Sequence, residues 1–124
     1  LPLLASRRLH SEDPITIVGF GLDDALSGSY GTLRMGDMKV ADADADYIIV
    51  TYDGDGSNVC FGDSGGPAIY FVRDDNGNMV GASIAGVVST GTHPLCGPGD
   101  TTHFVSVEKY IDAILKIVPE AQVI

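Results

Sequence analysis

The octapeptide CFGDSGGP, residues 60–67, carries one hydroxyl, that of Ser64, in the middle of a glycine-rich turn. A serine that attacks an acyl carbonyl needs its own amide N–H and a second amide to converge on the oxygen that becomes an oxyanion. Gly62 and Ser64 are spaced to supply these two amides, and Asp63 is expected to point away from the hydroxyl. The spacing therefore indicates acyl transfer with Ser64 as nucleophile. The alternative, an ordinary loop of glycine, aspartate, serine and proline, is what turn chemistry alone permits.

This octapeptide resembles the nucleophile motif of the trypsin/chymotrypsin-like serine endopeptidases, Gly-Asp-Ser-Gly-Gly-Pro preceded by a cysteine. Residues 18–21, VGFG, look like the family's Gly-Trp-Gly segment, and residues 88–91, VSTG, are similar to its Ser-Trp-Gly strand. The resemblance covers nearly the whole chain but only half of the family's fold. It implies the second barrel of such an enzyme, because the first barrel, which carries the catalytic histidine and aspartate in this family, has no counterpart here.

The same resemblance implies roles for residues around the nucleophile. Gly62 and Ser64 would form the oxyanion hole, and Asp63 would stabilise the active turn, as the family's aspartate does when it pairs with a new N-terminal amine. Two cysteines allow one intrachain pair, and either a disulfide in an exported protein or two free thiols in a cytosolic one fits their spacing. The resemblance favours the disulfide, between Cys60 and Cys96.

A substrate pocket is also implied. Asn58, six residues before the nucleophile, would form its floor in place of the aspartate found in trypsin. An arginine or lysine side chain would then lack its ion-pair partner, so we expect a small or medium uncharged side chain before the scissile bond. Thr102 is expected to narrow the pocket. The expected wall residues are Val59, Phe61, Ser89, Thr90 and Gly91.

A serine hydroxyl is a poor nucleophile until a base takes its proton. The chain has three histidines, His10, His93 and His103, and by the family pattern none stands at the catalytic position. We therefore expect a first barrel, on a separate chain or in a missing part of this one, to supply the histidine and aspartate. The complete protein is expected to be a serine endopeptidase acting on proteins or peptides, and this chain alone to be inactive.

Composition excludes several other classes of function. The 124 residues suit one domain, and the net charge of −10 argues against nucleic acids or anionic membranes as partners. No apolar run approaches the length of a membrane span, and we expect a secreted or extracytoplasmic protein. The acidic run at residues 53–58 fails the calcium-loop template, because position six is Asn58 rather than glycine. We predict no metal and no cofactor.

The chain alternates β-rich runs with turn signals, and only its end reads as helix. Six strands without a long helix between them predict an all-β fold, a six-stranded antiparallel Greek-key barrel with a C-terminal α-helix. We divide the chain into a leading segment or crossover (1–14), the barrel (15–106), and the helix with its tail (107–124). Within the helix, expected over 107–118, Ser106 is the candidate N-cap. The expected strands are 15–20, 30–40, 47–52, 67–72, 79–89 and 102–106.

The leading segment contains several leucines. Leu1, Leu3 and Leu4 are expected to add to an exposed apolar face of the barrel that would meet the first barrel.

Two other functions are compatible with the sequence. The parent protein could be a catalytically silent homologue that binds proteins or glycans, which a substituted histidine or aspartate in the first barrel would reveal. Alternatively, the barrel could be a stand-alone binding or structural module, in which case the intact gene product should begin close to Leu1.

Overall fold

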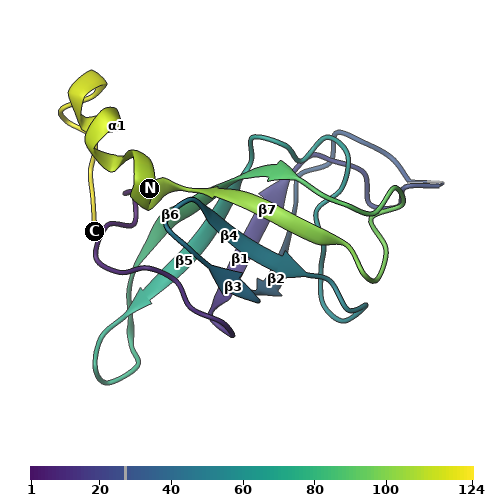
Figure 1. Cartoon of the computed structure of the whole chain (residues 1–124), viewed down its shortest axis with the longest axis horizontal. Coiled ribbons are helices and arrows are strands. Elements are labelled where there is room, and N and C mark those ends of the chain that lie inside the picture. Colours follow the sequence, from purple (N-terminus) through teal and green to yellow (C-terminus); the bar gives the residue numbers. More distant parts are fainter. Residues whose placement is uncertain (27) are drawn as a thin grey trace.

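In the computed structural model, which describes residues 1–26 and 28–124, all seven described strands belong to one antiparallel sheet that curls into a barrel (Figure 1). The sheet order is β2-β1-β5-β6-β7-β4-β3. This confirms the predicted fold class. The strands are β1 (Pro14–Gly19), β2 (Arg34–Lys39), β3 (Asp42–Ala43), β4 (Tyr47–Thr51), β5 (Pro67–Arg73), β6 (Met79–Thr90) and β7 (Thr101–Ser106).

The two ends of the sheet order are consecutive in the chain. Only Val40 and Ala41 separate β2 from β3, and the N–H of Ala41 already donates to the carbonyl of Ile49 in β4 (2.8 Å). One bent stretch of chain therefore pairs with β1 at one edge and with β4 at the other. The strand predicted at 30–40 corresponds to β2, and the two-residue strand β3 was not predicted.

The expected start of that strand, at residue 30, was wrong. Gly31 has a φ of 87° and donates its N–H to the carbonyl of Phe20 (2.9 Å), so the chain turns there. Such an angle suits glycine and not a strand. The pairing of β2 with β1 begins only at Arg34, opposite Gly19.

The barrel interior is filled by alternate residues of the strands, as expected for strands with one buried face. In β7, Thr102, Phe104 and Ser106 are buried while the residues between them are partly exposed. In β4, Ile48 and Val50 are buried in the same alternating pattern. The buried apolar residues that form the core are Leu4, Leu9, Ile15, Ile17, Met38, Val40, Ile48, Val50, Val59, Ala68, Tyr70, Ala85, Val88 and Phe104.

The leading segment belongs to this core. Leu4 and Leu9 are each only 3% exposed and contact the barrel interior. Leu3 forms parallel bridges with Ile84 of β6 and with Val123 near the other end of the chain. The expectation that these leucines extend an exposed apolar face was therefore wrong for Leu4, and of the three only Leu1 is well exposed.

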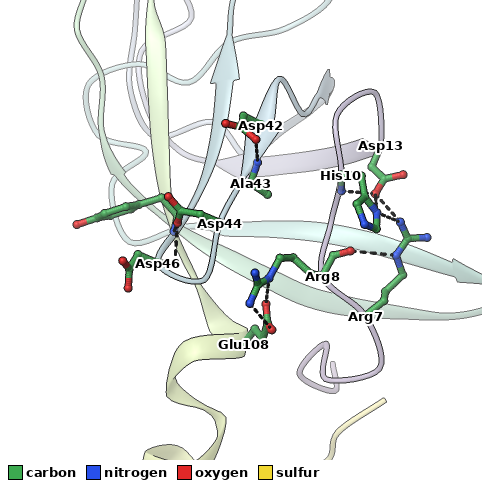
Figure 2. A network of polar contacts seen from close by, with 10 residues as sticks. Arg7, Arg8, His10, Asp13, Asp42, Ala43, Asp44, Asp46 and Glu108 are labelled. Carbon is green, nitrogen blue, oxygen red and sulfur yellow. Dashed lines mark hydrogen bonds and ion pairs between the residues drawn. The ribbon is translucent and has the colours of Figure 1, made fainter.

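Polar contacts fix the path of the leading segment across the barrel (Figure 2). Arg7 pairs with Asp13 (2.6 Å) and donates to the hydroxyl of Tyr70 in β5 (2.9 Å). Arg8 donates twice to the carboxylate of Glu108 (2.9 and 3.0 Å). Ion pairs this exposed contribute little energy individually, so the buried leucines are the main attachment.

The predicted C-terminal helix is present but begins differently. Residues Val107–Tyr110 form a 3-10 turn, and the α-helix, α1, spans only Ile111–Ile117. The side chain of Ser106 makes no capping hydrogen bond, so that expectation was wrong. Helix α1 lies at one end of the barrel, beside both chain termini (Figure 1). In the described part of the chain, no helix is long and apolar enough to cross a membrane.

The burial of the leading segment predicts a stability effect. Leu9→Ala should lower the free energy of unfolding by about 2–5 kcal/mol, because it leaves a cavity in the core. Leu1→Ala, at an exposed position, is the matched control and should change it by no more than about 0.5 kcal/mol. Urea unfolding measures both. Equal midpoints for the two variants would show that the segment does not belong to the core.

Candidate active site

The turn that carries Ser64 is fixed to strand β6. The N–H of Gly65 donates to the carbonyl of Val88, and the N–H of Val88 donates to the carbonyl of Gly66 (both 2.9 Å). Because these bonds hold the residues just after Ser64, the turn is anchored before β5 begins. Ser64 itself is exposed, and in the described part of the chain its hydroxyl has no hydrogen-bond partner.

Two backbone amides beside this hydroxyl are also without acceptors. Among the described residues, neither the N–H of Gly62 nor that of Ser64 donates a hydrogen bond. Gly62 has a φ of 93° and Gly65 a φ of 84°, angles that residues with side chains rarely adopt. A Cβ on Gly62 would also come within 3.1 Å of the Cα of Gly21. The glycines are therefore required by the shape of the turn.

The carboxylate of Asp63 turns toward the chain that follows β1. Its Oδ1 accepts the N–H of Gly21 and its Oδ2 accepts the N–H of Cys60 (both 2.9 Å). A Cβ at Gly19 would lie 2.1 Å from Oδ1, and a Cβ at Gly21 would lie 2.6 Å from the carboxyl carbon. Only glycine at both positions leaves room for this carboxylate, which is a physical reason for the VGFG segment.

The expected disulfide is present and holds two loops together. Cys60 and Cys96 are bonded (S–S 2.05 Å), so the loop before Ser64 is joined to the loop before β7. A pocket of about 370 Å³ lies between these loops and the end of β6, with Ser64 in its wall. All five residues expected in its walls line it: Val59, Phe61, Ser89, Thr90 and Gly91.

The other two expected pocket residues do not line it. Asn58 donates through its Nδ2 to Asp100 (2.7 Å) and to the carbonyl of Cys96 (3.0 Å), so its amide is used within the protein. Thr102 is fully buried, and its hydroxyl donates to the Oδ1 of Asn58 (3.4 Å). Side chains two apart on a strand share a face, so Thr102 lies one step deeper than Asp100. Asp100 lines the pocket instead.

Asp100 is a buried carboxylate, 2% exposed. Its Oδ1 accepts the N–H groups of Thr92 (2.7 Å) and His93 (2.9 Å) and, more weakly, the hydroxyl of Thr92 (3.3 Å), while its Oδ2 accepts the amide of Asn58. Burial alone would raise the pKa of Asp100, but the hydrogen bonds from Asn58, His93 and Thr92 outweigh it and hold this pKa below its ordinary value. The carboxyl is therefore ionised at neutral pH.

Of the three histidines, only His93 lines the pocket that contains Ser64. His10 is exposed in the leading segment beside Arg7 (Figure 2), and His103 in β7 makes an edge contact with Tyr47. His93 lines the pocket, but its Nδ1 accepts the N–H groups of Leu95 and Gly97 (3.0 and 3.2 Å). No histidine within the described ranges bonds to Ser64, so its hydroxyl has no hydrogen-bonded histidine there.

The acidic run at residues 53–58 shows no sign of a metal site. Asp53 accepts the N–H of Asp55 (2.9 Å), as a local turn requires. In residues 1–26 and 28–124, no group of three histidine, cysteine, aspartate or glutamate side chains could hold a metal ion.

Comparison with known proteins gives one family and one fold. The family model described as Trypsin matches residues 1–114. No curated protein matches the chain. Among solved structures, a mutant of human heparin-binding protein matches with a TM-score of 0.71 at 21% identity, over 97% of this chain and 50% of that one. The chain thus spans half the length of that structure, and at this identity the likeness concerns the fold alone.

The hydrogen bonds to Asp100 predict that the free energy of unfolding decreases at acidic pH. Because its folded pKa is lowered, its contribution is complete above about pH 5 and is lost as the pH falls below about 4. At pH 7, Asp100→Asn should cost about 1–3 kcal/mol, since an amide cannot accept all these bonds. The difference from wild type should shrink toward pH 2–3. Urea midpoints against pH measure it, with exposed Asp75→Asn as control, and a pH-independent difference would contradict the assignment.

Proposed function

Because this chain belongs to the trypsin family, we propose that it is the second barrel of a serine endopeptidase in which Ser64 is the nucleophile. One observation carries the proposal. An exposed hydroxyl without a hydrogen-bond partner lies at the wall of a pocket, next to the two unused amides of Gly62 and Ser64. Donors left free in a rigid turn are what an oxyanion hole requires.

The proposed reaction follows from this arrangement. The Oγ of Ser64 attacks the carbonyl carbon of the scissile peptide bond while its proton passes to a histidine of the first barrel. The carbonyl oxygen becomes an oxyanion that accepts the N–H groups of Gly62 and Ser64. The C–N bond then breaks as the histidine gives its proton to the leaving amine, which leaves the acyl group on Ser64. Water next attacks this acyl carbon while its proton passes to the histidine. The bond to the Oγ of Ser64 then breaks, and the histidine returns the proton to that oxygen.

The base is assigned to a first barrel outside these 124 residues. His10, His93 and His103 are each engaged elsewhere, and this chain corresponds to half of the matched structure. The first barrel, on a separate chain or on another part of the same one, is thus the proposed partner, and a protein or peptide is the proposed substrate. The net charge of −10 disfavours nucleic acids and anionic membranes.

Asp63 is proposed to hold the turn in its active form. Its carboxylate already accepts two backbone N–H groups, and a cavity of about 100 Å³ lies beside it, lined in part by Gly19, Gly21 and Gly36. In the proposed enzyme, an N-terminal amine released by cleavage would enter this cavity and pair with Asp63. The disulfide supports an oxidising compartment, so we propose that the protein is secreted.

The proposal predicts a large difference between the chain alone and the complete protein. With the first barrel present, Ser64 should react stoichiometrically with a peptidyl phosphonate and turn over peptide substrates. The isolated chain should show no turnover, because a nucleophile without its base retains at most about 10³- to 10⁴-fold acceleration over water. Mass spectrometry and a fluorogenic peptide assay measure the two readouts.

Ser64→Ala in the complete protein should abolish both labelling and turnover, while Ser11→Ala, at an exposed position of the leading segment, should retain both. A complete protein that binds peptides but neither reacts nor turns over would instead be a catalytically silent homologue. The matched human protein is named for binding heparin, a polyanion, but the acidity of this chain makes a polyanionic ligand unfavourable here. For that reason proteolysis remains the proposal.

A further inference from the structure

The pocket beside Ser64 ends on a charge that the motif pattern did not predict. Asp100 is buried, yet it belongs to the lining of the pocket that also contains Ser64. Its place at the floor was expected to be taken by neutral Asn58, which instead lies behind the carboxylate and donates to it. The physical basis for expecting an uncharged substrate side chain is therefore gone.

The charge of Asp100 is not compensated by a cation. Its four hydrogen bonds come from two backbone amides, one hydroxyl and one side-chain amide, all of them neutral donors. Within the described residues, no lysine, arginine or histidine side chain forms an ion pair with it. The titratable side chain facing it from the same loop, that of His93, is occupied by two backbone N–H groups.

Gly91 lies beside the carboxylate in the wall of the pocket and has no side chain to cover it. A Cβ at this residue would lie 3.2 Å from Oδ1 and 3.3 Å from Oδ2 of Asp100, tighter than most real contacts. Any side chain there would cover both oxygens. Because Gly91 has no side chain, both oxygens of this buried carboxylate stay uncovered on that side.

We propose that Asp100 makes this pocket selective for a cationic side chain, lysine or arginine, of the bound peptide. The inference rests on the proposed function, because it names the substrate class of the same site. A guanidinium or ammonium that enters the pocket gains a charge-assisted hydrogen bond to this carboxylate and neutralises its charge. The free energy cost of burying the carboxylate is already offset by its hydrogen bonds within the protein. A neutral side chain leaves that charge uncompensated, and an acidic one is repelled. Asn58 and Thr102 act as positioning residues, since they orient Asp100 without touching the substrate.

Small probes test the pocket without requiring catalysis. Benzamidine and its neutral analogue benzamide have nearly the same shape, so their difference in affinity for the 124-residue chain measures the effect of charge. Calorimetric titration at pH 7 should give at least about tenfold tighter binding of benzamidine, consistent with one charge pair out of bulk water. Equal affinities for the two probes would overturn the proposal.

Two variants assign the effect to Asp100. Asp100→Asn should reduce the preference for benzamidine to about twofold or less, while exposed Asp75→Asn, in the β5–β6 hairpin, makes the same change in net charge and should leave it intact. If Asp100→Asn does not fold, Gly91→Ala decides, because it keeps the carboxylate but covers its oxygens. That variant should weaken benzamidine binding about tenfold with little effect on benzamide. A preference that survives Gly91→Ala would mean that Asp100 only braces the loop.

The two proposals fail separately. If benzamidine binds selectively but the complete protein shows no Ser64-dependent cleavage, the cationic pocket stands and the proteolytic function is wrong. If the complete protein cleaves peptides after uncharged residues and Asp100→Asn leaves that preference unchanged, the proteolytic function stands and this inference is wrong.

Discussion

The contact between the Asp63 carboxylate and the backbone N–H groups of Gly21 and Cys60 joins the end of β1 to the turn that carries Ser64. A bare backbone at Gly19 and Gly21 is the steric condition for this contact. Because the next bonds tie the same turn to β6, the hydroxyl is held between two strands that are not neighbours in the sheet. The position of the turn that carries Ser64 therefore depends on one carboxylate and on glycines far from it in sequence.

A second carboxylate, Asp100, differs from Asp63 in its relation to the pocket that contains Ser64. Asp63 points into the protein, away from the pocket, whereas Asp100 lines the pocket. Both are satisfied by neutral donors, which fixes each carboxylate without cancelling its charge. The rest of the chain's acidity lies mostly on exposed loops, where solvent screens it.

Sequence reasoning succeeded where the determinants are local. The glycine-rich turn around Ser64 and the alternation of the strands follow from neighbouring residues, whereas the disulfide was expected from the resemblance to a known family. Asp100 was missed because its partner Asn58 is 42 positions away, and a lone aspartate after Gly-Pro-Gly looks like any turn residue. The burial of Leu4 was missed for the same reason, since its contacts come from distant strands. The irregular start of the terminal helix reflects the missing cap at Ser106, a detail of geometry that composition does not encode.

The bend at Val40 and Ala41 lets one stretch of chain serve both edges of the sheet. An open sheet presents a row of unpaired N–H and carbonyl groups on which a strand from another molecule can add. Here, within the described residues, the edge at β3 is only two residues long and the edge at β2 is six residues long. The bend thus limits one of the two edges to a two-residue template for the edge-to-edge aggregation to which β-proteins are prone.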